Sequence, residues 1–144
     1  MRAVLTRVTE ASVSISGSTV AEIGQGCLVL LGVHTEDKPE QAAKMADRIA
    51  GLRIFEDEAG KMNRNLAAVG GAVLLVSQFT LYADTRSRRP GFTAAARPDV
   101  AVPLYEQVIA DLRGRGFHVE TGVFGADMAV QSVNDGPVTI LLET

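Results

Sequence analysis

Hydrophobic and polar residues alternate along the first part of the chain, as they do in a half-buried β-strand. The alternation runs over Ala3–Ile15, where Val4, Thr6 and Val8 occupy every second position. Gly17-Ser18 then supplies a turn signal, and Thr19–Ile23 has the composition of a returning strand. The pattern therefore predicts that the chain begins with a β-hairpin.

Two continuous apolar runs predict strands that are buried on both faces. Cys27–Val33 follows Gly26, and Ala72–Val76 follows Gly70-Gly71. Both runs have the length and valine content of strands rather than helices. Three further strands are predicted to close the fold: Phe117–Thr121, Asp127–Val133 and Val138–Leu142.

Helical spacing is found in two places. Asp37 is a candidate N-cap, with Pro39 in the first turn and Glu40 three residues after the cap. Apolar residues then recur at helical spacing as far as Leu52. A second helix is predicted from Pro103 to Arg113, before two glycines. Between the helices, Phe55–Asn63 is predicted to be a loop or short hairpin.

These elements predict an α/β fold with mixed, largely antiparallel, barrel-like β-sheets and two main helices, as a single domain over residues 1–144. The hydrophobic fraction of 47% and the charged fraction of 22% argue against disorder. The single Cys27 cannot form an internal disulfide. No stretch approaches the ~20 apolar residues of a membrane span, and the first residues lack a signal-peptide core. We therefore expect a cytoplasmic protein that does not bind a membrane.

The net charge of -3 argues against a protein that coats RNA through its phosphates. One local exception is the segment around Arg86, Arg88 and Arg89, followed by Phe92. Its three arginines either bind phosphates or form a solvated loop with ion pairs to Asp84 or Glu56. Both interpretations stay open on the sequence.

The usual catalytic constellations are absent from the sequence. His34 and His118 have no cysteine partner and no motif around them, which favours surface or satisfied histidines. No H-E-x-x-H, paired C-x-x-C or G-x-S-x-G motif is present. Cys27 lies in an apolar run, where thiols are usually inert. We expect neither a metal site nor a cofactor.

Two segments remain unusual. Ser77–Leu81 (SQFTL) puts hydroxyl, amide and backbone N–H groups directly after a buried strand, where they could bind a carbonyl and an oxyanion. The alternative is a polar strand exit that satisfies its own backbone. Asn134–Thr139 (NDGPVT) contains a Gly-Pro pair that could line a pocket; the alternative is a tight hairpin turn.

Together these segments resemble the D-aminoacyl-tRNA deacylase family, and the pair SQFTL and NDGPVT is the specific part of the match. The similarity extends over essentially the whole chain. It is carried by Arg2–Val13, Gly24–Val33, Arg53–Asn65, Val76–Thr85, Arg88–Phe92, Thr121–Met128 and Asn134–Thr139.

The resemblance implies a homodimer whose active sites lie at the subunit interface. Gly136-Pro137 would form a cis peptide and reach into the partner's pocket, and Arg7 would hold that loop. Met128 would line the pocket. The catalytic wall would be formed by four residues, with Phe79 contributing mainly its backbone N–H: Ser77, Gln78, Phe79 and Thr80.

The implied reaction is hydrolysis of the ester of D-aminoacyl-tRNA, and of glycyl-tRNA, with rejection of L-aminoacyl-tRNA by the Gly-cisPro motif. Aminoacyl-tRNA and a second copy of the chain would be the partners, and DNA would not. Three alternatives remain. One is a general small-ester or amide hydrolase that uses Thr80 or Ser77 as nucleophile, and another is a non-catalytic tRNA- or metabolite-binding module. The third is a dimer in which both motifs are purely structural.

Overall fold

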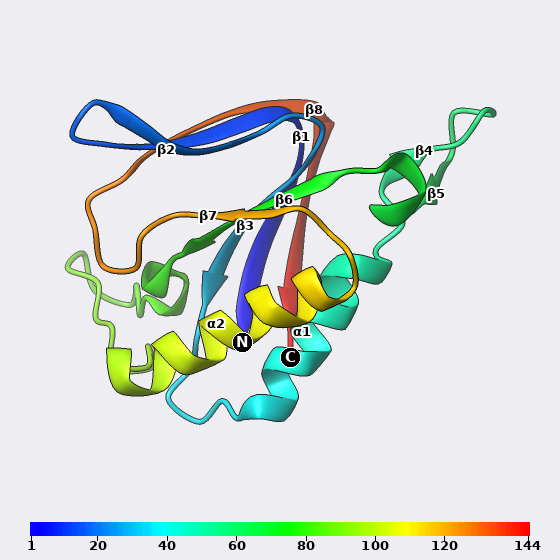
Figure 1. The fold of residues 1–144 in the computed structure, drawn as a ribbon. Coiled ribbons are helices and arrows are strands. Elements are labelled where there is room, and N and C mark those ends of the chain that lie inside the picture. The colour runs from blue at the N-terminus through cyan, green and yellow to red at the C-terminus, as the bar shows by residue number, and fades with distance from the viewer.

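A six-stranded mixed sheet forms the centre of the molecule, and both long helices cover one of its faces (Figure 1). The computed structural model describes all 144 residues. The strand order is β2-β1-β3-β6-β7, and β8 also pairs with β1. The elements are β1 (Arg2–Ile15), β2 (Ser18–Ile23), β3 (Gly26–Gly32), α1 (Pro39–Gly51), β4 (Phe55–Glu56), β5 (Met62–Arg64), η1 (Ala67–Val69), β6 (Ala72–Ser77), η2 (Phe79–Tyr82), α2 (Pro98–Gly114), β7 (Val119–Thr121) and β8 (Ala129–Glu143).

Most strand pairs are antiparallel. β1 runs antiparallel to β2, β3 and β8, whereas β6 is parallel to both β3 and β7. The first half of β1 pairs with β3 and its second half with β2, and the β1–β2 hairpin folds over the sheet to contact β6 and β7. The predicted fold class, mixed and barrel-like with two helices, is confirmed.

Side-chain alternation divides the core between the two faces of the sheet. On the helix-covered face, Ala3 and Leu5 of β1 are fully buried against α1 and α2. On the opposite face, a smaller cluster fills the space under the β1–β2 hairpin. That cluster contains Val8, Ala11, Val13, Ala21, Ile23, Leu28, Leu74 and Val76.

The N-cap of α1 is Lys38, so the predicted N-cap at Asp37 is wrong by one residue. The Gln41 side chain accepts a hydrogen bond from the Lys38 backbone N–H at 2.9 Å and so satisfies this helix start. The Asp37 carboxylate is used elsewhere. It accepts the N–H of His34 at 2.6 Å and forms an ion pair with the α-amino group of Met1 at 2.7 Å.

Helix α2 begins at Pro98, five residues before the predicted start at Pro103. Pro98 stands in the first turn, where a missing N–H costs nothing. Pro103 lies inside the helix and deprives the Asp99 carbonyl of its usual donor. Asp99 is exposed, so water can take that place. Neither helix is long and apolar enough to cross a membrane.

The two strands predicted over Asp127–Val133 and Val138–Leu142 are one continuous strand, β8. Both halves of β8 pair with β1, from Ser14 at one end to Arg2 at the other. A hairpin at the Asn134–Thr139 segment, the alternative reading of that sequence, is therefore wrong.

Instead, this segment forms a bulge in β8. Thr6 pairs with Thr139 and Val8 with Asn134, so β8 uses five residue steps where β1 uses two. The extra residues must leave the plane of the ladder. Asp135–Val138 is thereby pushed out of the sheet while the strand continues on either side.

Candidate functional site

The SQFTL segment lies where β6 leaves the sheet. Ser77 is the last residue of β6 and pairs with Leu31 of β3. The Gln78 N–H donates to the Leu31 carbonyl at 2.8 Å, and the short helix η2 follows directly. Gly32 allows this close approach, because a Cβ there would lie 3.0 Å from the Gln78 carbonyl oxygen. The end of β3 therefore fixes the start of the turn.

This turn presents aromatic and polar groups to solvent. Phe79 is 53% exposed, and its ring packs edge-on against Phe92 at 5.1 Å between centroids. Thr80 is also exposed. Phe79 is the first residue of η2, so the helix provides no acceptor for its N–H. A backbone donor is thus available beside an exposed hydroxyl.

The Thr80 hydroxyl is hydrogen-bonded to the Gln78 side-chain amide. An amide NH₂ group donates hydrogen bonds but does not remove a proton at neutral pH. The threonine therefore lacks the adjacent base that would activate it as a nucleophile. The arrangement suits binding and polarisation of a carbonyl better than covalent attack.

The second motif lies in the β8 bulge, where the Gly136–Pro137 peptide bond is cis and Gly136 has φ +133°. The Asn134 side chain holds the bulge closed: its Oδ1 accepts the Val138 N–H at 3.1 Å, and its Nδ2 donates to the Thr139 hydroxyl at 3.3 Å. Gly136 and Pro137 are exposed.

Arg7 supports this bulge from inside the protein. It is the one charged or polar residue in the buried set, with 5% of its surface exposed. Its Nε donates to the Asp135 carbonyl at 2.9 Å and lies 3.4 Å from the Asp135 carboxylate. Its Nη1 donates to the Ile54 carbonyl at 2.6 Å. A Cβ at Gly136 would lie 2.8 Å from Arg7 Nη2, so the glycine lets the loop pack closely on the guanidinium.

A polar hollow of about 440 Å³ adjoins this loop and is lined by residues that include Arg7, Asp135, Glu56 and Arg64. The neighbouring Cys27 thiol takes no part in it. Burial raises the pKa of Cys27 to about 12, against a smaller lowering by Arg7. The thiol stays protonated at neutral pH, and this agrees with its interpretation as an inert core residue.

The two motifs lie apart within one copy of the chain. Ser77 pairs with Leu31 and through it with Ala3, whereas Gly136 lies beside Arg7, further along β1. The motifs are displaced along the strand direction, and the strands that carry them, β6 and β8, are three strand spacings apart. Together these two displacements separate the motifs by roughly 19 Å. The sheet thus carries one motif near each end.

Met128 belongs to the end of the sheet that carries Ser77. It packs on the cluster that contains Val76 and lies against Gly122, where a Cβ would approach its sulfur to 2.5 Å. Of the sequence-predicted site residues, Met128 and the SQFTL segment therefore share one region, and Arg7 with Gly136 and Pro137 occupies another.

The basic segment forms a small hairpin, closed by reciprocal hydrogen bonds between Asp84 and Gly91 of 2.8 and 3.0 Å. Arg86 binds the Asp84 carboxylate through its guanidinium, with an ion-pair distance of 2.5 Å. The hydrogen bonds from Arg86 hold the pKa of Asp84 below its usual value. Arg88 and Arg89 are exposed and form no ion pair. The ion-pair interpretation thus describes Arg86, and the other two arginines keep their charge available.

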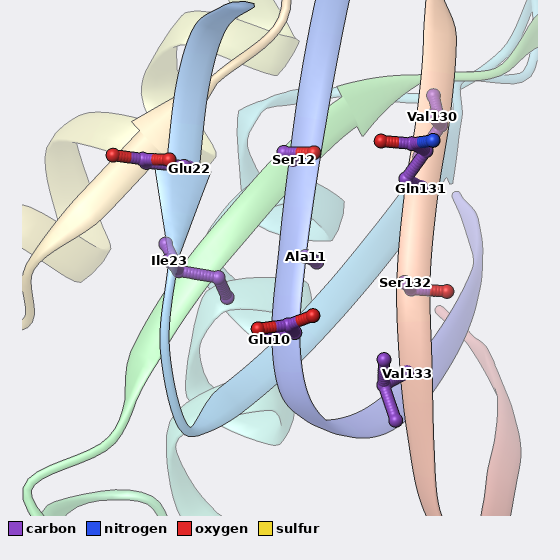
Figure 2. A pocket seen from close by; sticks show the side chains of 9 residues that line it. All are labelled: Glu10, Ala11, Ser12, Glu22, Ile23, Val130, Gln131, Ser132 and Val133. Carbon is purple, nitrogen blue, oxygen red and sulfur yellow. The ribbon is translucent and has the colours of Figure 1, made fainter.

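A further hollow contains no residue of either motif, although its lining residue Val133 directly precedes Asn134. It measures about 700 Å³ and lies over β2, β1 and β8 (Figure 2). Its charged lining residues are the carboxylates Glu10 and Glu22, without a basic side chain. Such a surface repels phosphates, and it contains none of the residues singled out by the sequence.

The histidines have local partners. His34 Nδ1 accepts the Glu36 N–H at 3.1 Å, and its ring packs edge-on against Tyr82. His118 is exposed and lies 3.1 Å from the Glu120 carboxylate. Neither histidine contacts Ser77 or Thr80.

Comparison with known proteins identifies the family. The model of the family described as D-Tyr-tRNA(Tyr) deacylase matches residues 4–143. The chain belongs to this family. A D-aminoacyl-tRNA deacylase of Thermus aquaticus is 59% identical over 145 residues, which cover 100% of this chain and 95% of the relative. One of Symbiobacterium thermophilum is 56% identical, covering 100% and 96%.

Solved structures of similar proteins share the fold. A "c-Myc DNA Unwinding Element Binding Protein" superimposes with a TM-score of 0.94 at 39% identity, covering 100% of this chain and 99% of that one. A structure described as a probable eukaryotic D-amino acid tRNA deacylase gives a TM-score of 0.87 at 16% identity, with 99% and 98% coverage. At that identity the second likeness concerns the fold alone.

Sequence reasoning missed the acceptors that place Arg7. They are backbone carbonyls, of Ile54 and Asp135, and a carbonyl has no signature in a sequence. It also missed that Phe92 packs on Phe79, although a phenylalanine following a basic hairpin hinted at a role for that residue.

Proposed function

We propose that this protein is a D-aminoacyl-tRNA deacylase, which hydrolyses the ester between a D-amino acid and the terminal ribose of tRNA as a proofreading step in the cytoplasm. The full-length match to relatives of that name, at 54–59% identity, carries the proposal. Water adds to the acyl carbon, the acyl–oxygen bond breaks, and the products are the free D-amino acid and tRNA with a free ribose hydroxyl.

The chemistry of the substrate explains why this site can work without a strong nucleophile. An aminoacyl ester is already activated, so positioning and oxyanion stabilisation are enough. One oxyanion donor typically contributes about 2.7–4 kcal/mol to the barrier. The free Phe79 N–H is suited to that role, with Ser77 and Gln78 orienting the substrate. The ribose hydroxyl next to the ester would direct the proton transfer.

Thr80→Ala tests this mechanism. Because the Thr80 hydroxyl has an amide and not a base as its partner, the variant should keep kcat within about tenfold of the wild-type value. Single-turnover hydrolysis of D-tyrosyl-tRNA measures it. Complete inactivation of a folded, substrate-binding variant, or a covalent acyl adduct on Thr80, would establish nucleophilic catalysis instead.

The active site is proposed to be composite, with Gly136-Pro137 of one copy entering the pocket at Ser77–Thr80 of the other. Two observations support this. The motifs lie near opposite ends of one sheet. A two-fold axis can therefore bring Ser77–Thr80 of each copy against Gly136-Pro137 of the other and form two equal sites. The Gly-Pro loop also protrudes from β8 and is exposed.

An apolar row with one exposed and two half-buried side chains supports the dimer. Leu141, which is 71% exposed, pairs with Val4, and Val4 pairs with Leu30. Directly paired residues lie on one face of a sheet, and this is the face that the helices leave open. A second copy would cover the row. Sedimentation of the wild-type protein should give a dimer, and a monomer at assay concentration would rule out the composite site.

Selection against L-amino acids would follow from the shape of the composite pocket. If the amino group, the Cα and the carbonyl carbon are held, an L side chain points at the carbonyls of Gly136 and Pro137, whereas a D side chain points outward. Rejection by collision needs no contact with the accepted side chain. The enzyme should therefore accept many D-residues, and glycyl-tRNA as well, since glycine has no side chain to collide.

The tRNA would be held by the basic hairpin. Arg88 and Arg89 are the arginines of this hairpin whose charge is not neutralised by a carboxylate, and phosphate groups are their natural partners. The contact between Phe79 and Phe92 joins this hairpin to the proposed catalytic turn.

Hydrolysis of matched D-tyrosyl-tRNA and L-tyrosyl-tRNA at equal enzyme concentration tests the function. The D-ester should be hydrolysed faster by roughly 100-fold or more. Equal release of both would indicate a general esterase and remove the role of Gly136-Pro137. Binding of either tRNA without release would indicate a non-catalytic tRNA-binding module.

A further inference from the structure

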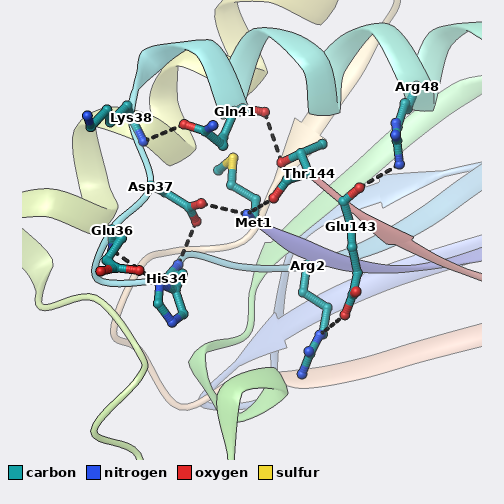
Figure 3. Close-up of polar contacts among 10 residues, drawn as sticks. All are labelled: Met1, Arg2, His34, Glu36, Asp37, Lys38, Gln41, Arg48, Glu143 and Thr144. Carbon is teal, nitrogen blue, oxygen red and sulfur yellow. Dashed lines mark hydrogen bonds and ion pairs between the residues drawn. The ribbon is translucent and has the colours of Figure 1, made fainter.

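The Arg2 side chain connects three parts of the fold that are distant in sequence. Its Nε donates to the Glu143 carboxylate at 2.6 Å (Figure 3). Its Nη1 donates to the Leu81 carbonyl at 2.8 Å, and its Cζ lies 4.9 Å from the centre of the Tyr82 ring. Arg2 thus binds the end of β8 with one side of its guanidinium and the end of η2 with the other.

The Leu81 carbonyl needs this donor from outside the turn. Within η2, the Gln78 carbonyl accepts the Leu81 N–H at 3.2 Å and the Thr80 carbonyl accepts the Ala83 N–H at 3.0 Å. The next donor in that series, the Asp84 N–H, is taken by the Gly91 carbonyl at 2.8 Å. The turn therefore has no N–H left for the Leu81 carbonyl, and the Arg2 guanidinium supplies the missing donor.

The two ends of η2 have different supports. β3 holds the first end through the hydrogen bond from Gln78 to Leu31 and the close packing at Gly32. The last end is held by the hydrogen bond from Arg2 to Leu81 and by the Tyr82 ring, which lies against Arg2 and, at 5.1 Å between centroids, against His34. Phe79 and Thr80 lie between these supports, so their direction depends on both.

We propose that Arg2 is a positioning residue for deacylation, which acts through Leu81 and Tyr82 to set the direction of the Phe79 N–H. The proposal rests on the assignment of Ser77–Thr80 as the reacting site. Oxyanion stabilisation depends on geometry, and a displacement of about 1 Å can reduce a rate by about 100-fold. Arg2 itself does not touch the substrate.

Arg2→Met tests the proposal, with Arg48→Met as the matched control. Arg48 Nη1 donates to the Glu143 backbone carbonyl at 2.5 Å, so it is anchored to the same residue as Arg2 (Figure 3) but does not contact η2. Arg2→Met should lower kcat for D-tyrosyl-tRNA by about tenfold while KM stays within about twofold, and Arg48→Met should leave both unchanged.

Two further readouts separate positioning from a general loss of structure. The backbone amide resonances of Phe79 and Thr80 should shift in Arg2→Met and not in Arg48→Met. Arg2→Lys should recover part of kcat, because an ammonium group can still donate to the Leu81 carbonyl. If urea unfolding shows that Arg2→Met is not fully folded, the same comparison is made with Arg2→Lys alone against the wild type.

The failures of the two ideas differ. If the amide resonances of Phe79 and Thr80 are unchanged in Arg2→Met, Arg2 does not position the turn, and the proposal is overturned whatever the value of kcat. Shifted resonances with a wild-type kcat would instead show that Ser77–Thr80 is not the reacting site, and the positioning role would fall with it. A lowered kcat that Arg48→Met reproduces would overturn the proposal as well.

Discussion

Replacing Arg7 with methionine is expected to lower kcat/KM for D-tyrosyl-tRNA by about 100-fold and the free energy of unfolding by about 3 kcal/mol. Arg7 is buried and donates to the carbonyls of Asp135 and Ile54. Methionine fills similar space but leaves both carbonyls without a donor. The loss of activity follows because the Gly136-Pro137 loop would lose its internal support.

Urea unfolding and single-turnover kinetics measure the two effects. Arg115→Met is the matched control, because Arg115 forms an exposed ion pair with Asp47, and such pairs contribute only about 0–1 kcal/mol. Since the loop and not the reacting turn is displaced, Arg7→Met should also reduce the preference for D- over L-tyrosyl-tRNA. Unaltered activity in a folded Arg7→Met variant would contradict the proposed role of the loop.

Gly26→Ala should destabilise the protein by about 3 kcal/mol or more, with the melting temperature lowered by roughly 10 °C. Gly26 begins β3 and pairs with Ala72 of β6. A Cβ at this position would lie 1.9 Å from the Ala72 carbonyl oxygen. That atom is backbone and cannot swing aside like a side chain, so the two strands would have to separate where their pairing starts.

Gly24→Ala provides the control for this change. It lies two residues earlier, and a Cβ there meets no atom within 4 Å. Calorimetric melting of both variants should therefore show a large decrease for Gly26→Ala and a small change for Gly24→Ala. Equal melting temperatures of the two variants would mean that β3 and β6 can separate at this point without loss of stability.

The strands were predictable because their signals are local. Alternation over β1 and the apolar runs of β3 and β6 reflect burial of one or both faces of the same residues that form the strand. The continuity of β8 was not predictable. It depends on both halves pairing with β1, a contact made across nearly the whole chain, whereas the Asn-Asp-Gly-Pro sequence favours a turn locally.

The candidate site was likewise predictable only in part. The SQFTL and NDGPVT segments could be selected from their side chains and from the family resemblance. The supports of these segments could not, since Arg7 and Arg2 act on the backbone carbonyls of Ile54, Asp135 and Leu81. The start of α1 shows a related limit: Asp37 has the composition of an N-cap, but its carboxylate binds Met1 and His34 instead.

The pairing of β1 with β8 also bears on how the chain folds during synthesis. β1 leaves the ribosome well before β8, yet the two form the longest ladder of the sheet, with Arg2 opposite Glu143. Until β8 emerges, one edge of β1 has no partner and the Gly-Pro loop does not exist. Contacts between such distant segments form slowly. Nascent chains should therefore expose an unpaired β1 edge until β8 emerges, and this edge is where chaperones or other nascent copies would bind.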